Sequence, residues 1–190
     1  MPFAAAAWFA VVLVIVIVGF VVIATYNDVV ALIQRIDKAW ANVDVALKQR
    51  HDELPNLVAA VRDVMTFEQA VLDEVSRLRN AYDPDRPVPE QAALSAETSQ
   101  AVRSLFAVVE NYPVLRSADN VIELQAEIER LEEVIADRRE LYNDQVYRYN
   151  TRIAQLPAVF LAGLFGWTRR DFFAAADDDR ARPDVSLRTA

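Results

Sequence analysis

The sequence predicts an all-α protein: an antiparallel helical bundle of three to four long helices, continuous with an N-terminal transmembrane helix. Residues 3–24 contain no charged side chain. Farther along, apolar residues recur at spacings of three and four, the pattern of helices with one buried face. The composition agrees, because 190 residues include only 3 glycines and 8 prolines, which are too few for a turn-rich β architecture.

The uncharged stretch predicts a membrane anchor, with the transmembrane helix assigned to residues 3–25. As an α-helix, 3–24 would be about 33 Å long, which is enough to cross the hydrocarbon core of a bilayer. No Lys or Arg precedes it and no Ala-x-Ala site follows it, which argues against a cleaved signal peptide. Because Arg35 and Lys38 follow the span, the positive-inside rule favours a body on the cytoplasmic side.

The bundle is expected over residues 26–156. Pro55 should break or kink the first helix, and Asn56 can cap the helix that follows. The last helix holds its apolar residues in a near-heptad register, as in a coiled coil, between acidic faces that we interpret as solvated. The expected helices run from the anchor to about 54, from about 57 to 80, from about 90 to 110 and from about 117 to 155.

Residues 157–174 form an amphipathic, aromatic-rich segment that is too short to span a bilayer. Three arrangements remain open: in the membrane interface, folded over the bundle, or against a neighbouring copy. The tail, 175–190, is acidic and is expected to be disordered. The candidates for membrane-interface or oligomer contact are Phe160, Phe165, Trp167, Arg169, Arg170, Phe172 and Phe173.

Several motifs occur in a fixed order behind the anchor: Arg50-His51-Asp52-Glu53-Leu54-Pro55-Asn56-Leu57-Val58, Tyr112-Pro113, Tyr142-Asn143, Tyr149-Asn150 and Ala162-Gly163-Leu164-Phe165-Gly166. With them, residues 8–173 resemble the LemA family. That resemblance implies an antiparallel bundle attached by one span to the bacterial inner membrane, with no established enzymatic activity. The chain departs from the family pattern at Gln49, which replaces a basic residue, and at Phe67-Glu68, where the family usually has His-Glu.

One set of polar residues is expected to meet inside the bundle, because buried charge needs carboxylate or amide partners. We interpret it as a buried network that fixes helix register, the best-attested use of such pairs, with a ligand or metal site as the alternative. The candidate residues are Asp44, Arg50, His51, Glu68, Glu132, Arg139 and Asn143.

The sequence lacks the usual catalytic inventory. There is no cysteine, and the only histidine is His51. A di-iron bundle needs two Glu-x-x-His motifs, whereas Lys48 stands three residues before His51. No Gly-rich phosphate loop is present, and a net charge of −8 gives no electrostatic footprint for nucleic acid. We therefore expect no enzymatic activity, no cofactor, no metal and no nucleic-acid partner.

The sequence thus predicts a non-enzymatic scaffold that is held in the lipid bilayer and self-associates as a homo-oligomer or organises partners there. Two alternatives are kept. One is an adaptor or regulator of another membrane protein, such as a protease or transporter, and the other is a small-ligand or metal-binding bundle. Trp40 is expected to pack in the bundle, and the Tyr142 and Tyr149 pair to be half-buried there or to face another protomer.

Overall fold

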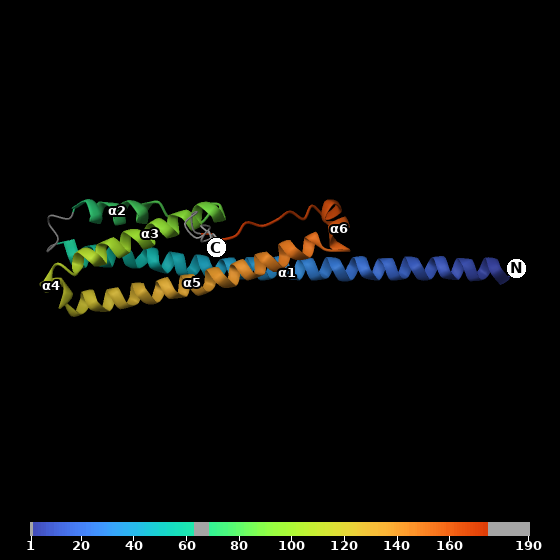
Figure 1. The fold of residues 1–190 in the computed structure, drawn as a ribbon, viewed down its shortest axis with the longest axis horizontal. Helices are drawn as coiled ribbons and strands as arrows, with labels where there is room; N and C mark the ends of the chain where they lie inside the picture. Colours follow the sequence, from blue (N-terminus) through green and yellow to red (C-terminus); the bar gives the residue numbers. More distant parts are fainter. Residues whose placement is uncertain (1, 63–68, 175–190) are drawn as a thin grey trace, which may run out of the picture. The chain divides into compact units, whose positions relative to one another are not determined.

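The computed structural model confirms the all-α class (Figure 1). It describes residues 2–62 and 69–174, and within these ranges every regular element is a helix. Glu68 and the tail 175–190 lie outside the described residues. The helices are α1 (Pro2–Arg62), α2 (Gln69–Asn80), α3 (Val88–Val109), α4 (Pro113–Arg116), α5 (Asp119–Ala154) and α6 (Ala158–Phe165).

The chain forms two compact units. The first, which we call the anchor unit, contains Met1–Trp40 and Leu141–Arg170. The second, the core unit, contains Ala41–Glu140 and Asp171–Ala190. Helices α1 and α5 therefore each contribute residues to both units, and each unit is described by itself below.

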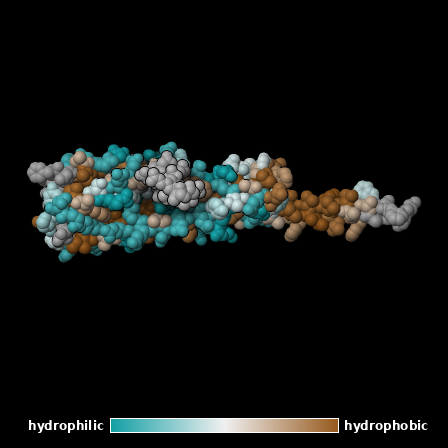
Figure 2. All heavy atoms as spheres, viewed as in Figure 1, coloured by the Kyte–Doolittle hydropathy of each residue, from teal (hydrophilic) through white to brown (hydrophobic). Residues whose placement is uncertain are grey.

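Helix α1 is a single helix of 61 residues, so the uncharged N-terminal stretch does run on into the bundle sequence without a break. Over residues 7–24 almost every side chain is exposed, including Trp8, Phe9 and Ile15. This part of α1 is long and apolar enough to cross a membrane. Figure 2 shows it as a continuous apolar surface.

Pro55 does not end α1, so of the break or kink expected there, the break is wrong and the kink stays a prediction. The helix continues to Arg62 with Pro55 inside it, and Asn56 donates a hydrogen bond to the Glu53 carboxylate rather than capping a new helix. A proline removes one helical hydrogen bond and crowds the preceding turn. Leu54 and Leu57 are both buried on either side of it, and this packing offsets the lost bond.

The core unit contains one main apolar cluster, built from four segments. Its buried side chains come from the end of α1, from α2 and α3, and from the beginning of α5. Leu115 of α4, a single turn that the sequence pattern did not reveal, adds to this cluster. Fully buried members from the four main segments are Leu57, Leu72, Leu105 and Ile128.

The predicted ends of the later helices are close to the observed ones. Helix α2 ends at Asn80 as expected. Helix α3 begins two residues before the expected Glu90, because Pro87 stands at its N-cap and Pro89 fits in its first turn. The near-heptad positions of α5 are buried within the chain: Val121, Ile128, Leu131 and Ile135 in the core unit, and Tyr142, Val146, Tyr149 and Ile153 in the anchor unit.

Candidate functional site

A buried arginine organises the polar interior of the core unit. Arg50 of α1 is 3% exposed, and its guanidinium donates a 2.7 Å hydrogen bond to Oε1 of Glu132 on α5. The same guanidinium donates to the hydroxyl oxygens of Ser99 at 2.8 Å and Ser95 at 3.1 Å, both on α3. Ser99 in turn donates to Oε2 of Glu132 at 2.7 Å. One charged group thus joins three helices.

This network satisfies its own polar atoms. Among the described residues, every buried side-chain nitrogen or oxygen has a hydrogen-bond partner. A fully paired charge in a low-dielectric interior is strongly held, whereas an unpaired one is costly. Ser95 and Ser99 were missed by sequence reasoning, although their i, i+4 spacing places both on one face of the predicted helix.

Asp44 and His51, two other candidates on α1, both contact Tyr82, a residue that the sequence did not single out. The Tyr82 hydroxyl donates a 2.9 Å hydrogen bond to Asp44 Oδ1, and the Tyr82 ring lies 4.9 Å from the His51 ring. The pKa of Tyr82 is raised above its ordinary value, mainly by burial. The hydrogen bond to Asp44 raises it further.

Burial also lowers the pKa of His51 below 6.5. The Asp52 carboxylate opposes this shift, and the Arg79 guanidinium adds to it. His51 therefore favours the neutral form in the folded protein.

A cavity of about 20 Å³ is lined by His51 and Tyr82, by other polar residues that include Arg50 and Gln91, and by leucines. Such a space holds about one water molecule. It is too small for an organic ligand. In the part of the chain that the structure describes, no group of three or more His, Cys, Asp or Glu side chains is placed to hold a metal ion.

The three remaining network candidates are Arg139, Asn143 and Glu68. Arg139 lines an open groove of about 260 Å³ on the core unit, together with Arg103, Glu132 and Phe173. Asn143 belongs to the anchor unit, and Glu68 is not among the described residues. The structure therefore brings together Arg50 and Glu132, and it places Arg139 beside the same groove as Glu132. The grouping of Asn143 and Glu68 with them stays a prediction.

In the anchor unit, three aromatic rings meet just past the end of the uncharged stretch. The Tyr26 ring lies 5.0 Å from that of Phe165 and 6.1 Å from that of Trp167, and the last two rings are 5.2 Å apart. This cluster holds α6 against α1 at the second residue after Ala24. Such distances are typical of favourable aromatic pairs.

A strap returns from α6 along α5. Gly166 ends α6 with a left-handed φ of 67°, the conformation that glycine adopts without steric cost. The Tyr149 hydroxyl then donates to the carbonyl of Thr168 at 2.9 Å. Asn150 exchanges two hydrogen bonds of 2.9 Å with the backbone of Arg170.

The other aromatic candidates differ in their surroundings. Phe173 is 3% exposed and belongs to the core unit, so its ring is covered by its own chain rather than free for the expected outer contact. Phe172, Arg169 and Arg170 are exposed. Trp40 packs against Tyr142 with ring centroids 5.4 Å apart, and both Tyr142 and Tyr149 are buried within the chain.

The fold and these sites define a membrane-associated helical-bundle protein in which the buried polar side-chain atoms of the described residues have hydrogen-bond partners. A family model described as the LemA family matches residues 39–187. The chain therefore belongs to the LemA family, as its motifs indicated.

Named relatives come from two bacteria. Magnetosome proteins MamQ 1 and MamQ 2 of Paramagnetospirillum magneticum are each 25% identical to this chain over 174 residues, covering 78% of it. Magnetosome protein MamQ of Magnetospirillum gryphiswaldense is 22% identical over the same length, with the same coverage. The chain spans 64% of the length of these relatives. Neither the family description nor these names describes an enzyme.

Proposed function

We propose that this protein is a non-enzymatic scaffold, anchored by one span in the bacterial inner membrane, that self-associates or organises partner proteins beside the bilayer. The observation that carries this proposal is the uncharged stretch 7–24 at the start of α1, whose side chains are almost all exposed among the residues that the structure describes. In water such a surface would be strongly unfavourable, whereas lipid accommodates it. With the anchor in place, the positive-inside rule favours a cytoplasmic bundle.

The polar chemistry of the chain supports a structural role. The buried guanidinium of Arg50 is bonded to Glu132 and to Ser99, and the cavity that Arg50 lines with His51 has room for about one water molecule. A catalytic site needs a reactive group that can reach a substrate in a cleft of ligand size. The network around Arg50 is instead suited to fixing the register of three helices.

Self-association is supported by apolar side chains that the core unit leaves exposed, namely Val45, Val114 and Ile122. Single exposed apolar residues are common on any protein surface. Anchoring changes their effect, because confinement to a membrane raises the effective concentration of copies facing one another. Weak lateral contacts then suffice to build an assembly.

The test compares the full chain with a version that starts at Tyr26, both purified under the same mild detergent and measured by light scattering and electron microscopy. The proposal predicts a regular assembly for the full chain and small particles for the shortened one. Monodisperse monomers in both forms would contradict self-association. The variant Val45→Lys in the full chain tests whether this exposed residue contributes to self-association. A smaller assembly is expected.

A groove between α2 and α3 favours the adaptor as a second candidate. It has a volume of about 520 Å³, with Val71 and Ala101 among its apolar residues and Glu74, Arg77 and Glu97 among its charged ones. Arg77 bridges both carboxylates, at 2.7 Å and 3.4 Å. An adaptor would be a monomer by itself and would retain a stoichiometric membrane-protein partner, which Val71→Glu should release.

A further inference from the structure

Helix α6 presents an apolar surface that its own unit does not cover. Phe160 is 78% exposed and Leu164 is 75% exposed, and Leu156 just before the helix is exposed as well. No residue of α6 is charged or polar. A run of large apolar side chains exposed to this extent marks a contact surface.

The position of α6 indicates what covers this surface. On α1, Asp28 is the first charged residue after the uncharged stretch, and its carboxylate pairs with Arg152 near the end of α5. Past this ion pair, both segments become uncharged: α1 backward from Asn27 to residue 3, and the other segment forward over 153–168. The ion pair thus marks one level at which two segments leave the charged part of the anchor unit.

After α6 the chain returns to the level of the Asp28–Arg152 ion pair. Arg169 and Arg170 are the next charged residues, and the strap bonds Arg170 to Asn150, two residues before Arg152 on α5. Residues 153–168 therefore leave the charged part of the anchor unit and return to it at nearly the same level of α5. Helix α6 is the apolar tip of this excursion. Phe165 contacts Tyr26, so this tip lies beside the base of the predicted span.

We propose that α6 is a second membrane contact, a re-entrant apolar segment embedded in the leaflet into which the base of α1 inserts. This inference rests on the proposed anchoring of α1. The rings of Tyr26 and Trp167 lie at the level of the lipid headgroups, where such side chains are enriched. Arg169, Arg170 and the Asp28–Arg152 pair remain on the aqueous side, where the exposed side chains of Arg169 and Arg170 face lipid phosphates.

The occupant is lipid because α6 continues the apolar surface that α1 itself presents. Eight helical residues are far too few to cross a bilayer, so the segment enters one leaflet only. Because α6 has no polar face, all of its side chains can be buried in the acyl-chain region next to the headgroups. A second copy covering α6 is the competing occupant, and the experiment below separates the two.

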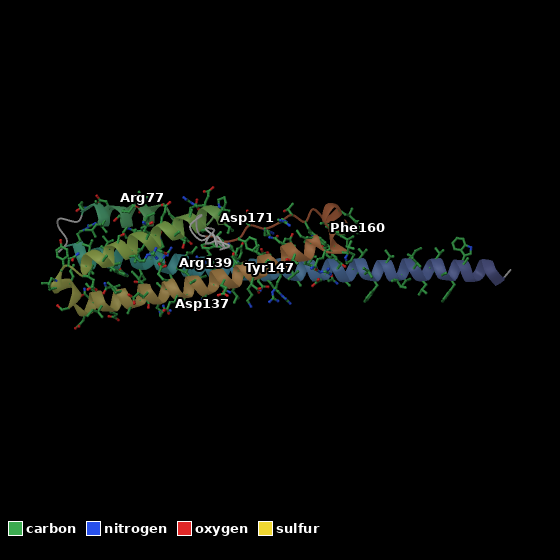
Figure 3. All side chains as sticks on the ribbon, in the orientation of Figure 1. Arg77, Asp137, Arg139, Tyr147, Phe160 and Asp171 are labelled. Carbon is green, nitrogen blue, oxygen red and sulfur yellow. The ribbon has the colours of Figure 1, made fainter. Side chains whose placement is uncertain are left out.

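The absence of cysteine from all 190 residues allows single spin labels to be placed in the full chain. The chain is reconstituted into vesicles of phosphatidylcholine and phosphatidylglycerol with a label at Phe160→Cys. Tyr147→Cys on α5 is the matched control, because Tyr147 is an aromatic residue of the same unit and is 62% exposed (Figure 3). Ile15→Cys reports on the anchor, and Leu164→Cys repeats the test at a second site of α6.

The measurement is relaxation by oxygen, which concentrates in lipid, against relaxation by a water-soluble nickel chelate. We expect the labels at 160 and 164 to resemble the label at 15, with access to oxygen and exclusion of nickel, and the label at 147 to show the reverse. A water-exposed label at 160 would overturn the proposal. So would a label that neither reagent reaches and that shows spin–spin broadening, because a second copy would then cover α6. Failure at 15 would instead overturn the anchor.

Discussion

The guanidinium of Arg50 and the carboxylate of Glu132 lie 2.7 Å apart inside the core unit and tie α1 to α5. The Arg50 side chain is 4% exposed, whereas that of Glu132 is 31% exposed, so the buried guanidinium depends on a carboxylate at the edge of the interior. A buried charge that loses its counter-ion costs far more than a surface ion pair contributes. The free energy of unfolding should therefore depend strongly on substitutions at either residue of this pair.

Glu132→Ala should lower the free energy of unfolding by about 3–5 kcal/mol, because it leaves the Arg50 charge buried and unpaired. The measurement is chemical denaturation of the full chain in detergent, followed by far-ultraviolet circular dichroism. Glu133→Ala is the matched control, since Glu133 is the adjacent residue of α5 and is exposed. Equal effects at the two positions would contradict the assigned role of Arg50.

Leu131→Ala should lower the free energy of unfolding by about 2–5 kcal/mol, because Leu131 is fully buried and the smaller side chain leaves a cavity. Leu141→Ala, on the same helix but exposed, should change it by less than about 0.5 kcal/mol. Denaturation midpoints of the two variants compare the positions directly. A similar loss at both would show that the near-heptad face is not the buried one.

The stability of the core unit should fall in mild acid through His51. The folded-state pKa of this residue is lowered below the unfolded value of 6.5, so the unfolded chain binds the proton more tightly. The contribution of the neutral ring is complete above pH 6.5 and is lost as the pH falls toward the folded-state pKa. Between pH of about 7.5 and about 5.5, the wild type should therefore lose more stability than His51→Gln. If the wild type and His51→Gln lost the same stability over this pH range, His51 would not be the cause of the loss.

Gly166→Ala should weaken the junction between α6 and the strap by about 1–2 kcal/mol, because φ is 67° at this residue. An added Cβ meets no atom within 4 Å, so the cost comes from the backbone alone. Gly163→Ala, inside α6 and equally open, should instead favour the helix. Hydrogen exchange of the peptide over residues 158–170 distinguishes the two: faster exchange is expected in the first variant and slower exchange in the second.

The helices could be predicted because their signals are local. Repeating apolar positions gave α5 to within two residues at its N-terminal end, and the prolines after Asn80 located the loop before α3. Pro55 was misjudged because its local effect opposes the helix, while the packing of Leu54 and Leu57 that sustains α1 is tertiary. Tertiary contacts of this kind are absent from a single sequence.

The polar sites could be predicted only in part. Arg50 and Glu132 drew attention because buried charge demands a partner. Serine occurs at both buried and exposed positions, so the sequence alone did not mark Ser95 and Ser99 as members of the network. Their role follows from the packing of α3. The pairing of Asn150 with Arg170 joins residues 20 positions apart through backbone atoms, for which side-chain patterns carry no signal.

The central claim is that copies of the chain associate while held in a bilayer. The 190-residue chain carrying Tyr147→Cys is labelled with donor or acceptor dye, mixed in vesicles, and diluted with added lipid. The account predicts energy transfer that stays above the level for randomly placed molecules as lipid is added, and that is lower in Val45→Lys. Transfer that falls to the random level on dilution would contradict it.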